Sequence, residues 1–278
     1  MKSAVLITAM VLGLVGLAGS ADGSPLTWNT CLSPCCYYSL TSSVRIVSGG
    51  NPSGSTEADV VFTFQALEDA TKTIVTRGFE SQNTDGTGNA VKAEIKIWGG
   101  GLGVNSSTYP ASSDEGSPDH AVDNHGPDEF IVYELPADNT KPLSFKIGWK
   151  YSDADIKTWI GGALSLDLLD LLALGTFNWN QGNTLVSSYG FVAESFSNVV
   201  ENTAQSFTND AVGRYLVIGA QSGSDNQDYF KVLQLTASVP VPEPALPVLL
   251  WLGLLGVTAQ AARRRRTRRS RTRAAASR

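Results

Sequence analysis

The sequence predicts an all-β protein built as a single β-sandwich of jelly-roll type. Asp59–Ala66 and Ala90–Trp98 alternate apolar and polar residues with a period of two, as half-buried strands do. Four further runs are rich in β-branched and aromatic residues: Glu129–Leu135, Leu143–Lys150, Arg214–Gln221 and Tyr229–Ala237. Clusters of Gly, Asn, Ser and Asp separate these runs, as turns require. The body of about 217 residues, 22–238, can bury one sizeable core.

One stretch, Ser165–Gly175, has the pattern of a helix, and Gly175 is suited to end it. Neither a phosphate-binding loop nor a dinucleotide-binding fingerprint occurs, and no repeat of fixed period is present. The body is therefore expected to be a single β domain with at most one helix.

The N-terminus, residues 1–21, has the pattern of a signal peptide. Lys2 provides the positive charge, Ala4–Ala18 is an uncharged apolar run, and small residues follow it. Cleavage is expected after Ser20 or Ala21. We therefore expect the body of the protein to be exported from the cytoplasm.

The C-terminus, residues 239–278, has the pattern of a membrane anchor. Ala245–Ala262 contains no charge and as a helix would be roughly 27 Å long, enough to cross a hydrocarbon core. A cluster of arginines follows and would stop transfer on the cytoplasmic side: Arg263, Arg264, Arg265 and Arg266. A buried helix with a basic nucleic-acid arm is the alternative, and it ranks behind because the N-terminus also indicates a membrane.

The charge distribution argues against nucleic acid as a partner. Between Asp22 and Ser238 there are 25 acidic and 11 basic residues, a net charge of −14, whereas the nine arginines of 263–278 have no acidic neighbour. Such a body repels nucleic acid and anionic lipid. Divalent cations or neutral sugars are more compatible ligands.

The C-terminal segment resembles the PEP-CTERM sorting signal. Pro242, Glu243 and Pro244 precede the apolar span and the arginines, in the order that this signal has. The resemblance implies that exosortase, a membrane-embedded transpeptidase of Gram-negative bacteria, cleaves near the triplet. The protein would then cross the inner membrane, be anchored transiently, and finish at the cell surface or outside the cell. An ordinary anchor with a proline-rich stalk remains the alternative.

Much of Trp98–Leu235 resembles the exosortase-dependent surface proteins. The resemblance rests on four runs: Gly101–Val104, Ser117–Asn124, Ile147–Ile156 and Gly213–Leu235. It implies a non-catalytic surface or matrix protein associated with extracellular polysaccharide in a biofilm. The alternative is a polysaccharide-binding module, or a glycan-active enzyme, delivered by the same route.

A loop rich in oxygen ligands makes calcium the candidate cofactor, and no other is expected. Its side chains are those of Asp119, Asp123, Asn124 and Asp128, with Glu129 beside them. Asp153 and Asp155 are expected to close over the same edge of the sheet. The spacing differs from that of an EF-hand. The competing interpretation, which we favour, is that these residues form Asx-turns without a metal.

Other candidate residues carry weaker signals. His120 and His125 are five residues apart in the same loop, and their spacing favours loop residues over a zinc pair. Trp98 and Trp149 lie in strand-like runs and are expected in the core. Trp179 is the best candidate for an exposed ring, although we expect it too to pack against the core. No Gly-x-Ser-x-Gly elbow is present, so we do not expect an enzyme.

Three cysteines stand near the start of the body: Cys31, Cys35 and Cys36. An exported chain meets an oxidising compartment, so one disulfide and one remaining thiol are expected. A bond between Cys35 and Cys36 would strain the intervening peptide. Cys31 is therefore expected to pair with Cys35 or Cys36.

Overall fold

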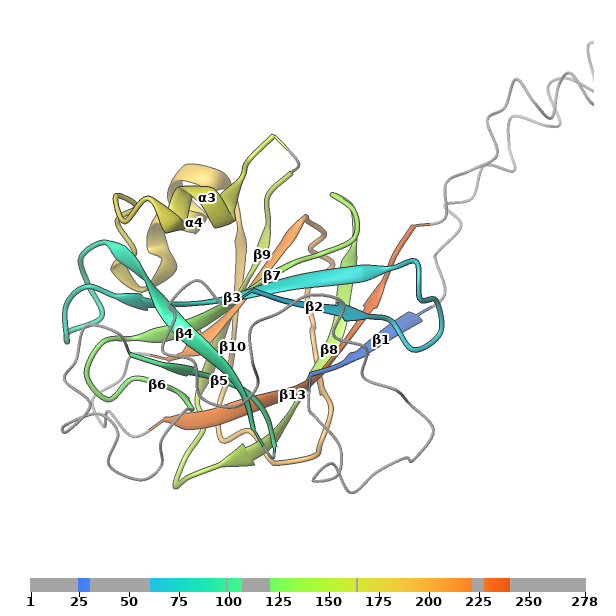
Figure 1. Ribbon diagram of the computed structural model, residues 1–278, viewed down its shortest axis with the longest axis horizontal. Helices are drawn as coiled ribbons and strands as arrows, with labels where there is room; N and C mark the ends of the chain where they lie inside the picture. The colour runs from blue at the N-terminus through green and yellow to red at the C-terminus, as the bar shows by residue number, and fades with distance from the viewer. Residues whose placement is uncertain are drawn as a thin grey trace, which may run out of the picture. The chain divides into compact units, whose positions relative to one another are not determined.

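The computed structural model describes residues 25–30, 61–98, 100–106, 121–163, 165–221 and 228–240 (Figure 1). The strands are β1 (Pro25–Asn29), β2 (Phe62–Gln65), β3 (Thr73–Ser81), β4 (Ala90–Trp98), β5 (Gly101–Asn105), β6 (Val122–Asp123), β7 (Glu129–Glu134), β8 (Lys141–Lys150), β9 (Ile156–Gly161), β10 (Val192–Phe196), β11 (Gln205–Ser206), β12 (Tyr215–Ala220) and β13 (Tyr229–Ser238). The helical turns are α3 (Leu168–Ala173), η2 (Asn180–Gly182) and α4 (Asn183–Tyr189). The predicted all-β class is confirmed.

The strands form one antiparallel sheet that is nearly closed on itself. Its order is β10-β9-β12-β7-β3-β4-β5-β13-β8-β11. The bend lies in β4, because its first half, from Ala90 to Ala93, pairs with β3 and its second half, from Glu94 to Trp98, pairs with β5. Strand β4 therefore joins two halves of the sheet that face each other across a core.

The two edge strands, β10 and β11, approach each other without pairing. Phe145 on β8 contacts both Phe196 at the end of β10 and Phe207 just after β11, with ring centroids 5.1 and 5.8 Å apart. Glu194 on β10 accepts a hydrogen bond from the Thr208 backbone N–H at 2.9 Å. Side chains thus close the gap that backbone pairing leaves open.

Strands β7 and β12 are buried on both faces, which explains the unbroken apolar runs Phe130–Tyr133 and Tyr215–Ala220. On β12, Leu216 and Ile218 pack into the core between the two halves of the sheet. Tyr215 and Val217, on the opposite face, belong to a second core. Because side chains alternate along a strand, two apolar layers require an apolar residue at every position.

The second core lies under the helical segment 166–190, which covers the outer face of β7, β9 and β12 (Figure 1). The Asp167 carboxylate caps α3 by accepting the Asp170 N–H at 3.0 Å. Gly175 follows α3 in the left-handed conformation (φ +63°), so the predicted helix and its glycine end are confirmed. The following helix, α4, had no counterpart in the sequence prediction.

Strand β1, the first described strand, pairs with β13, the last one. Pro25 pairs with Ser238 and Asn29 with Gln234, so β1 is antiparallel to the last half of β13. Trp28 is fully buried in the core between the halves of the sheet. The first described residue, Pro25, therefore lies beside the end of β13.

Candidate functional site

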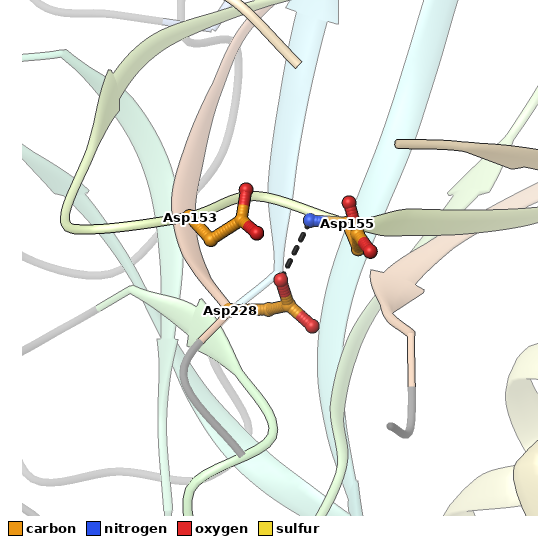
Figure 2. A group of neighbouring side chains, drawn as sticks. All are labelled: Asp153, Asp155 and Asp228. Carbon is orange, nitrogen blue, oxygen red and sulfur yellow. Dashed lines mark hydrogen bonds between the residues drawn. The ribbon is translucent and has the colours of Figure 1, made fainter. Parts of the chain in front are cut away.

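Three carboxylates meet where β8 leads into β9 and where β13 begins. One carboxylate oxygen from each of Asp153, Asp155 and Asp228 lies within 4.8 Å of the other two (Figure 2). The Asp155 N–H donates to Asp228 Oδ1 at 2.7 Å, and the Tyr229 N–H donates to the carbonyl of Asp153 at 3.2 Å. Backbone hydrogen bonds between two distant segments thus bring these acids together. We call these three residues the acidic cluster.

Asn124 holds the most buried member of the acidic cluster. Its Nδ2 donates to Asp228 Oδ2 at 2.9 Å, and the Asp228 N–H donates back to Asn124 Oδ1 at 3.1 Å. Asp228 is 1% exposed and Asn124 is 2% exposed. A carboxylate buried to this extent requires such hydrogen bonds, because an unpaired buried carboxylate would lower the stability of the fold by roughly several kcal/mol.

The acidic cluster has the chemistry of a site for a hard cation, although it is incomplete. Calcium takes six to eight oxygen ligands, so carbonyls or water would have to supply the oxygens that Asp153, Asp155 and Asp228 do not. Hydrogen bonds already use part of each carboxylate of Asp155 and Asp228. These three residues are nevertheless the group that would hold a metal in the described part of the chain.

The residues predicted for calcium are divided between several places. Asp123 Oδ1 accepts the His125 N–H at 2.9 Å, which is the Asx-turn of the competing interpretation. The Asp128 N–H donates to Ser81 Oγ at 2.8 Å. Of the predicted set, Asn124 bonds to Asp228 of the acidic cluster. Asp153 and Asp155, which were expected at this edge, are members of the cluster. Asp119 lies outside the described residues.

Asp228 was not predicted from the sequence. It follows a run of Gly, Ser, Asp, Asn and Gln and directly precedes β13, a context that resembles any polar turn. Its partner Asn124 is 104 positions away. Asp228 directly precedes β13, and Asp153 follows β8, the strand that pairs with β13. Only this pairing places the two residues together, and the local sequence does not reveal it.

A small pocket lies at the rim of the second core. Its volume is about 110 Å³. Strand ends and the helical segment together provide its lining: Asp128, Glu129, Lys157, Trp159, Trp179, Gln181, Ser195, Ala220 and Gln221. We call it the tryptophan pocket.

The two tryptophans of this pocket are packed as core residues. Trp179 is 1% exposed and stacks on Phe130 with ring centroids 3.6 Å apart, and Trp159 meets it edge to face at 5.2 Å. Lys157 lies over the Trp159 ring, 5.5 Å from its centroid. The expected packing of Trp179 is confirmed, and an exposed ring at this position is wrong. Trp149 was expected in the core, and this expectation is wrong, because the ring is only half-buried and lies beneath Lys231.

Three polar atoms of this lining are buried without a hydrogen-bond partner among the described residues. They are the indole Nε1 atoms of Trp159 and Trp179 and the side-chain Oε1 of Gln221. Each such group costs about 1–3 kcal/mol when it loses water and gains no partner. Unpaired atoms of this kind call for an explanation, and here all three belong to residues of one pocket.

The backbone of the pocket's helical rim is unusual. Asn180, Gln181 and Gly182 have φ values of +35°, +53° and +71° in succession. The left-handed region costs about 1–2 kcal/mol for a residue with a side chain. Gly182 is required here, because a Cβ at this position would lie 2.7 Å from Nε1 of Trp159.

Gln221 connects the tryptophan pocket with the acidic cluster. Its backbone N–H donates to the carbonyl of Asp155 at 2.9 Å, and its carbonyl accepts from Asn124 Nδ2 at 2.9 Å. Its side chain lines the pocket. The loop between β6 and β7, which contains Asn124 and Asp128, therefore contributes to both places.

The remaining predicted residues lie outside the described part of the chain. These are the cysteines Cys31, Cys35 and Cys36, the triplet Pro242, Glu243 and Pro244, the arginines that follow, His120 and the signal peptide. His125 is an exposed loop residue, as expected. No helix in the described ranges has the length and apolar character needed to span a membrane.

Comparisons with known proteins find no relative: no family model, no curated protein and no solved structure matches this chain.

Proposed function

We propose that this protein is a non-catalytic component of the cell surface or extracellular matrix, exported and then processed by exosortase at its C-terminus. The observation that carries the proposal is the order of the C-terminal segment. Pro242, Glu243 and Pro244 come a few residues after β13 ends at Ser238, and the uncharged run and the arginines follow. A cleavage near the triplet would remove the anchor without cutting into the sheet.

The charge of the body and the positions of its chain ends support this function. The net charge of −14 favours polysaccharide over nucleic acid as the surrounding polymer. Pro25 and Ser238 are paired, so a tether at the C-terminal side holds the sheet at a single place. Within this proposal the domain is a jelly-roll-like sandwich, with the bend in β4 joining its two layers.

The test follows the protein through the cell. Wild-type protein and Glu243→Ala are expressed in a host with the sorting enzyme, the cells are fractionated, and the C-terminus of each product is determined by mass spectrometry. We expect the mature wild type to lack Arg263–Arg266 and Glu243→Ala to accumulate in the membrane with its tail intact. The matched control is Asp138→Ala, which removes an exposed acid from the body. A mature wild type that retains its arginines would refute the proposal.

A polysaccharide-binding module is the second candidate function. The tryptophan pocket favours it, because the pocket collects unpaired polar atoms and charged side chains at one rim of the domain. The described residues give no comparable support to the catalytic form of that alternative.

A further inference from the structure

We propose that the tryptophan pocket binds one neutral sugar unit, held by its hydroxyl groups at an end or a branch of a polysaccharide. This inference rests on the proposed function for the setting, since only an exported domain would meet such polymers. It goes beyond that function by assigning a ligand class and a site.

The first support is the mixture of unpaired donors and acceptors. Trp159 and Trp179 are each at least 98% buried and bring two N–H donors without a partner, and Gln221 brings one acceptor. A hydroxyl group both donates and accepts, so adjacent hydroxyls can satisfy both kinds of atom at once. A purely apolar occupant would leave all three unpaired.

The second support is the balance of charge around the pocket. Asp128 and Glu129 are acidic residues of the lining, although the Glu129 carboxylate also accepts the Asp123 N–H at 3.3 Å, and Lys157 brings one ammonium group. The acidic residues disfavour an anion, and the ammonium group disfavours a divalent cation. The ammonium group of Lys157 is a good partner for hydroxyls, so a neutral ligand with many hydroxyls fits best.

The third support is the size of the pocket and the way its rings are packed. A volume of about 110 Å³ is well below the roughly 300–1,000 Å³ of pockets that enclose drug-sized ligands. Phe130 covers one face of Trp179, and Lys157 lies over a face of Trp159. Little of either ring face therefore remains for stacking against the sugars of a long chain. We expect recognition of a single sugar unit through hydrogen bonds.

The experiment observes the indole N–H groups directly. Full-length protein in mild detergent is labelled with ¹⁵N-tryptophan, and the indole resonances are recorded during titration with glucose, galactose or mannose. Trp159→Phe and Trp179→Phe assign the two resonances. We expect both to shift in a saturable manner with at least one of these sugars, with an affinity on the order of millimolar, as a few hydrogen bonds provide.

Two pocket variants with a matched control locate the binding. Ser195 is an exposed residue of the pocket on β10, so Ser195→Phe should fill the mouth and abolish the shifts without unfolding the protein. The same substitution on the other edge strand, Ser206→Phe, should leave them unchanged. Lys157→Met should weaken binding about tenfold, as expected for a lost hydrogen bond to a charged group.

Three results would overturn the inference. They are the absence of a shift with all three sugars, equal shifts in Ser195→Phe and the wild type, and saturable shifts with glucuronate or phosphate in place of neutral sugars. None of these results affects the sorting experiment, which depends on Glu243 and not on the pocket. Failure of the ligand assignment and failure of the proposed function are therefore distinguishable.

Discussion

Gly182 is the residue on which the helical segment closes over Trp159. We predict that Gly182→Ala lowers the free energy of unfolding by about 2–4 kcal/mol. The added Cβ would lie 2.5 Å from Cζ2 of Trp159, and the backbone there has φ +71°. Equilibrium unfolding in urea, followed by tryptophan fluorescence, measures the loss.

Gly190 provides the control for that substitution. Its φ is +69°, and a Cβ there would meet nothing within 4 Å. Gly190→Ala should therefore cost only the backbone strain, about 1–2 kcal/mol. Equal losses in the two variants would mean that the contact with Trp159 contributes nothing to the effect.

Individual site residues were predictable only where their chemistry was local. The Asx-turn at Asp123 follows from an Asp two residues before its donor, and the sequence analysis included it. Asp155 and Asn124 were named as candidates, but their common partner Asp228 was not, because strand pairing across the sheet brings it there. The unpaired indole of Trp179 depends on packing against Phe130 and could not have been read from a polar turn.

At the level of elements, α3 is tied to the sheet through Tyr215. The Leu168 N–H donates to the Tyr215 hydroxyl at 3.3 Å. Burial raises the pKa of Tyr215, and the Glu134 and Asp167 carboxylates add to this rise. The hydrogen bond from the Leu168 N–H and, to a lesser extent, the charge of Arg214 oppose it, but the pKa remains raised. Burial also raises the pKa of Tyr133, in the core between the halves of the sheet.

These raised pKa values predict a loss of stability in alkaline solution. Below the unfolded pKa of about 10, the tyrosines are protonated in both the folded and the unfolded state. Their full contribution to the free energy of unfolding is therefore present at these pH values. Above that pH the unfolded state releases protons first, and stability falls as the pH rises toward the folded pKa. We expect Tyr215→Phe to show a shallower alkaline decline than the wild type in urea unfolding at several pH values. An unchanged slope would contradict the prediction.

The calcium expectation can be tested in two places, at the acidic cluster and at the turn that Asp123 forms. A ligand specific to the folded state adds RT ln(1 + [L]/Kd), about 2.7 kcal/mol at a hundredfold excess over Kd. We predict that any calcium-specific rise in unfolding temperature disappears in Asp153→Asn and persists in Asp123→Asn. Asp153 belongs to the acidic cluster, whereas Asp123 is engaged in its own turn.

Magnesium at matched ionic strength is the control for this measurement. Equal rises with both ions would indicate general screening of the negative body rather than a site. Loss of the calcium effect in Asp123→Asn alone would restore the loop that the sequence first suggested and would contradict the assignment to the acidic cluster.

Several strands with strong alternation or unbroken apolar runs were predicted well, whereas β3 and β9 had no counterpart in the prediction and several short elements were missed as well. β4, β7, β8, β12 and β13 lie where the sequence placed them, with bounds that differ by at most two residues. β5 consists of Gly101, Leu102, Gly103, Val104 and Asn105, in which glycines hide the strand pattern. α4 has seven residues with weak helix propensity, and its packing on the second core stabilises it.

For the molecule as a whole, β1 is the strand that pairs with the last half of β13. We predict that Trp28→Ala lowers the free energy of unfolding by about 3–5 kcal/mol, because Trp28 is fully buried in the core that both halves share. Trp149→Ala, which removes a half-buried ring beneath Lys231, should cost about 1 kcal/mol. Urea unfolding compares the two variants, and equal losses would refute the role of β1.

The fold class could be predicted from the sequence, whereas the near closure of the sheet could not. Period-two patterns identify strands and their buried faces, but they carry no information on which strands become neighbours. The passage of β4 from β3 to β5 and the contact of Phe196 with Phe145 are long-range events. The second core was missed for the same reason, since a strand buried on both faces resembles one that is simply apolar.

The enclosed position of β13 has a mechanical consequence for a tethered protein. β8 borders this strand along one side, and β6, β5 and β1 border it in turn along the other. A pulling force that enters at Ser238, along the axis of β13, loads the hydrogen bonds on both sides in shear, so that many of them must break together. The same force applied between Pro25 and Ser238 would open the β1–β13 pair one bond at a time. A domain held only from its C-terminal side would therefore resist the drag of a flowing medium along its strongest direction.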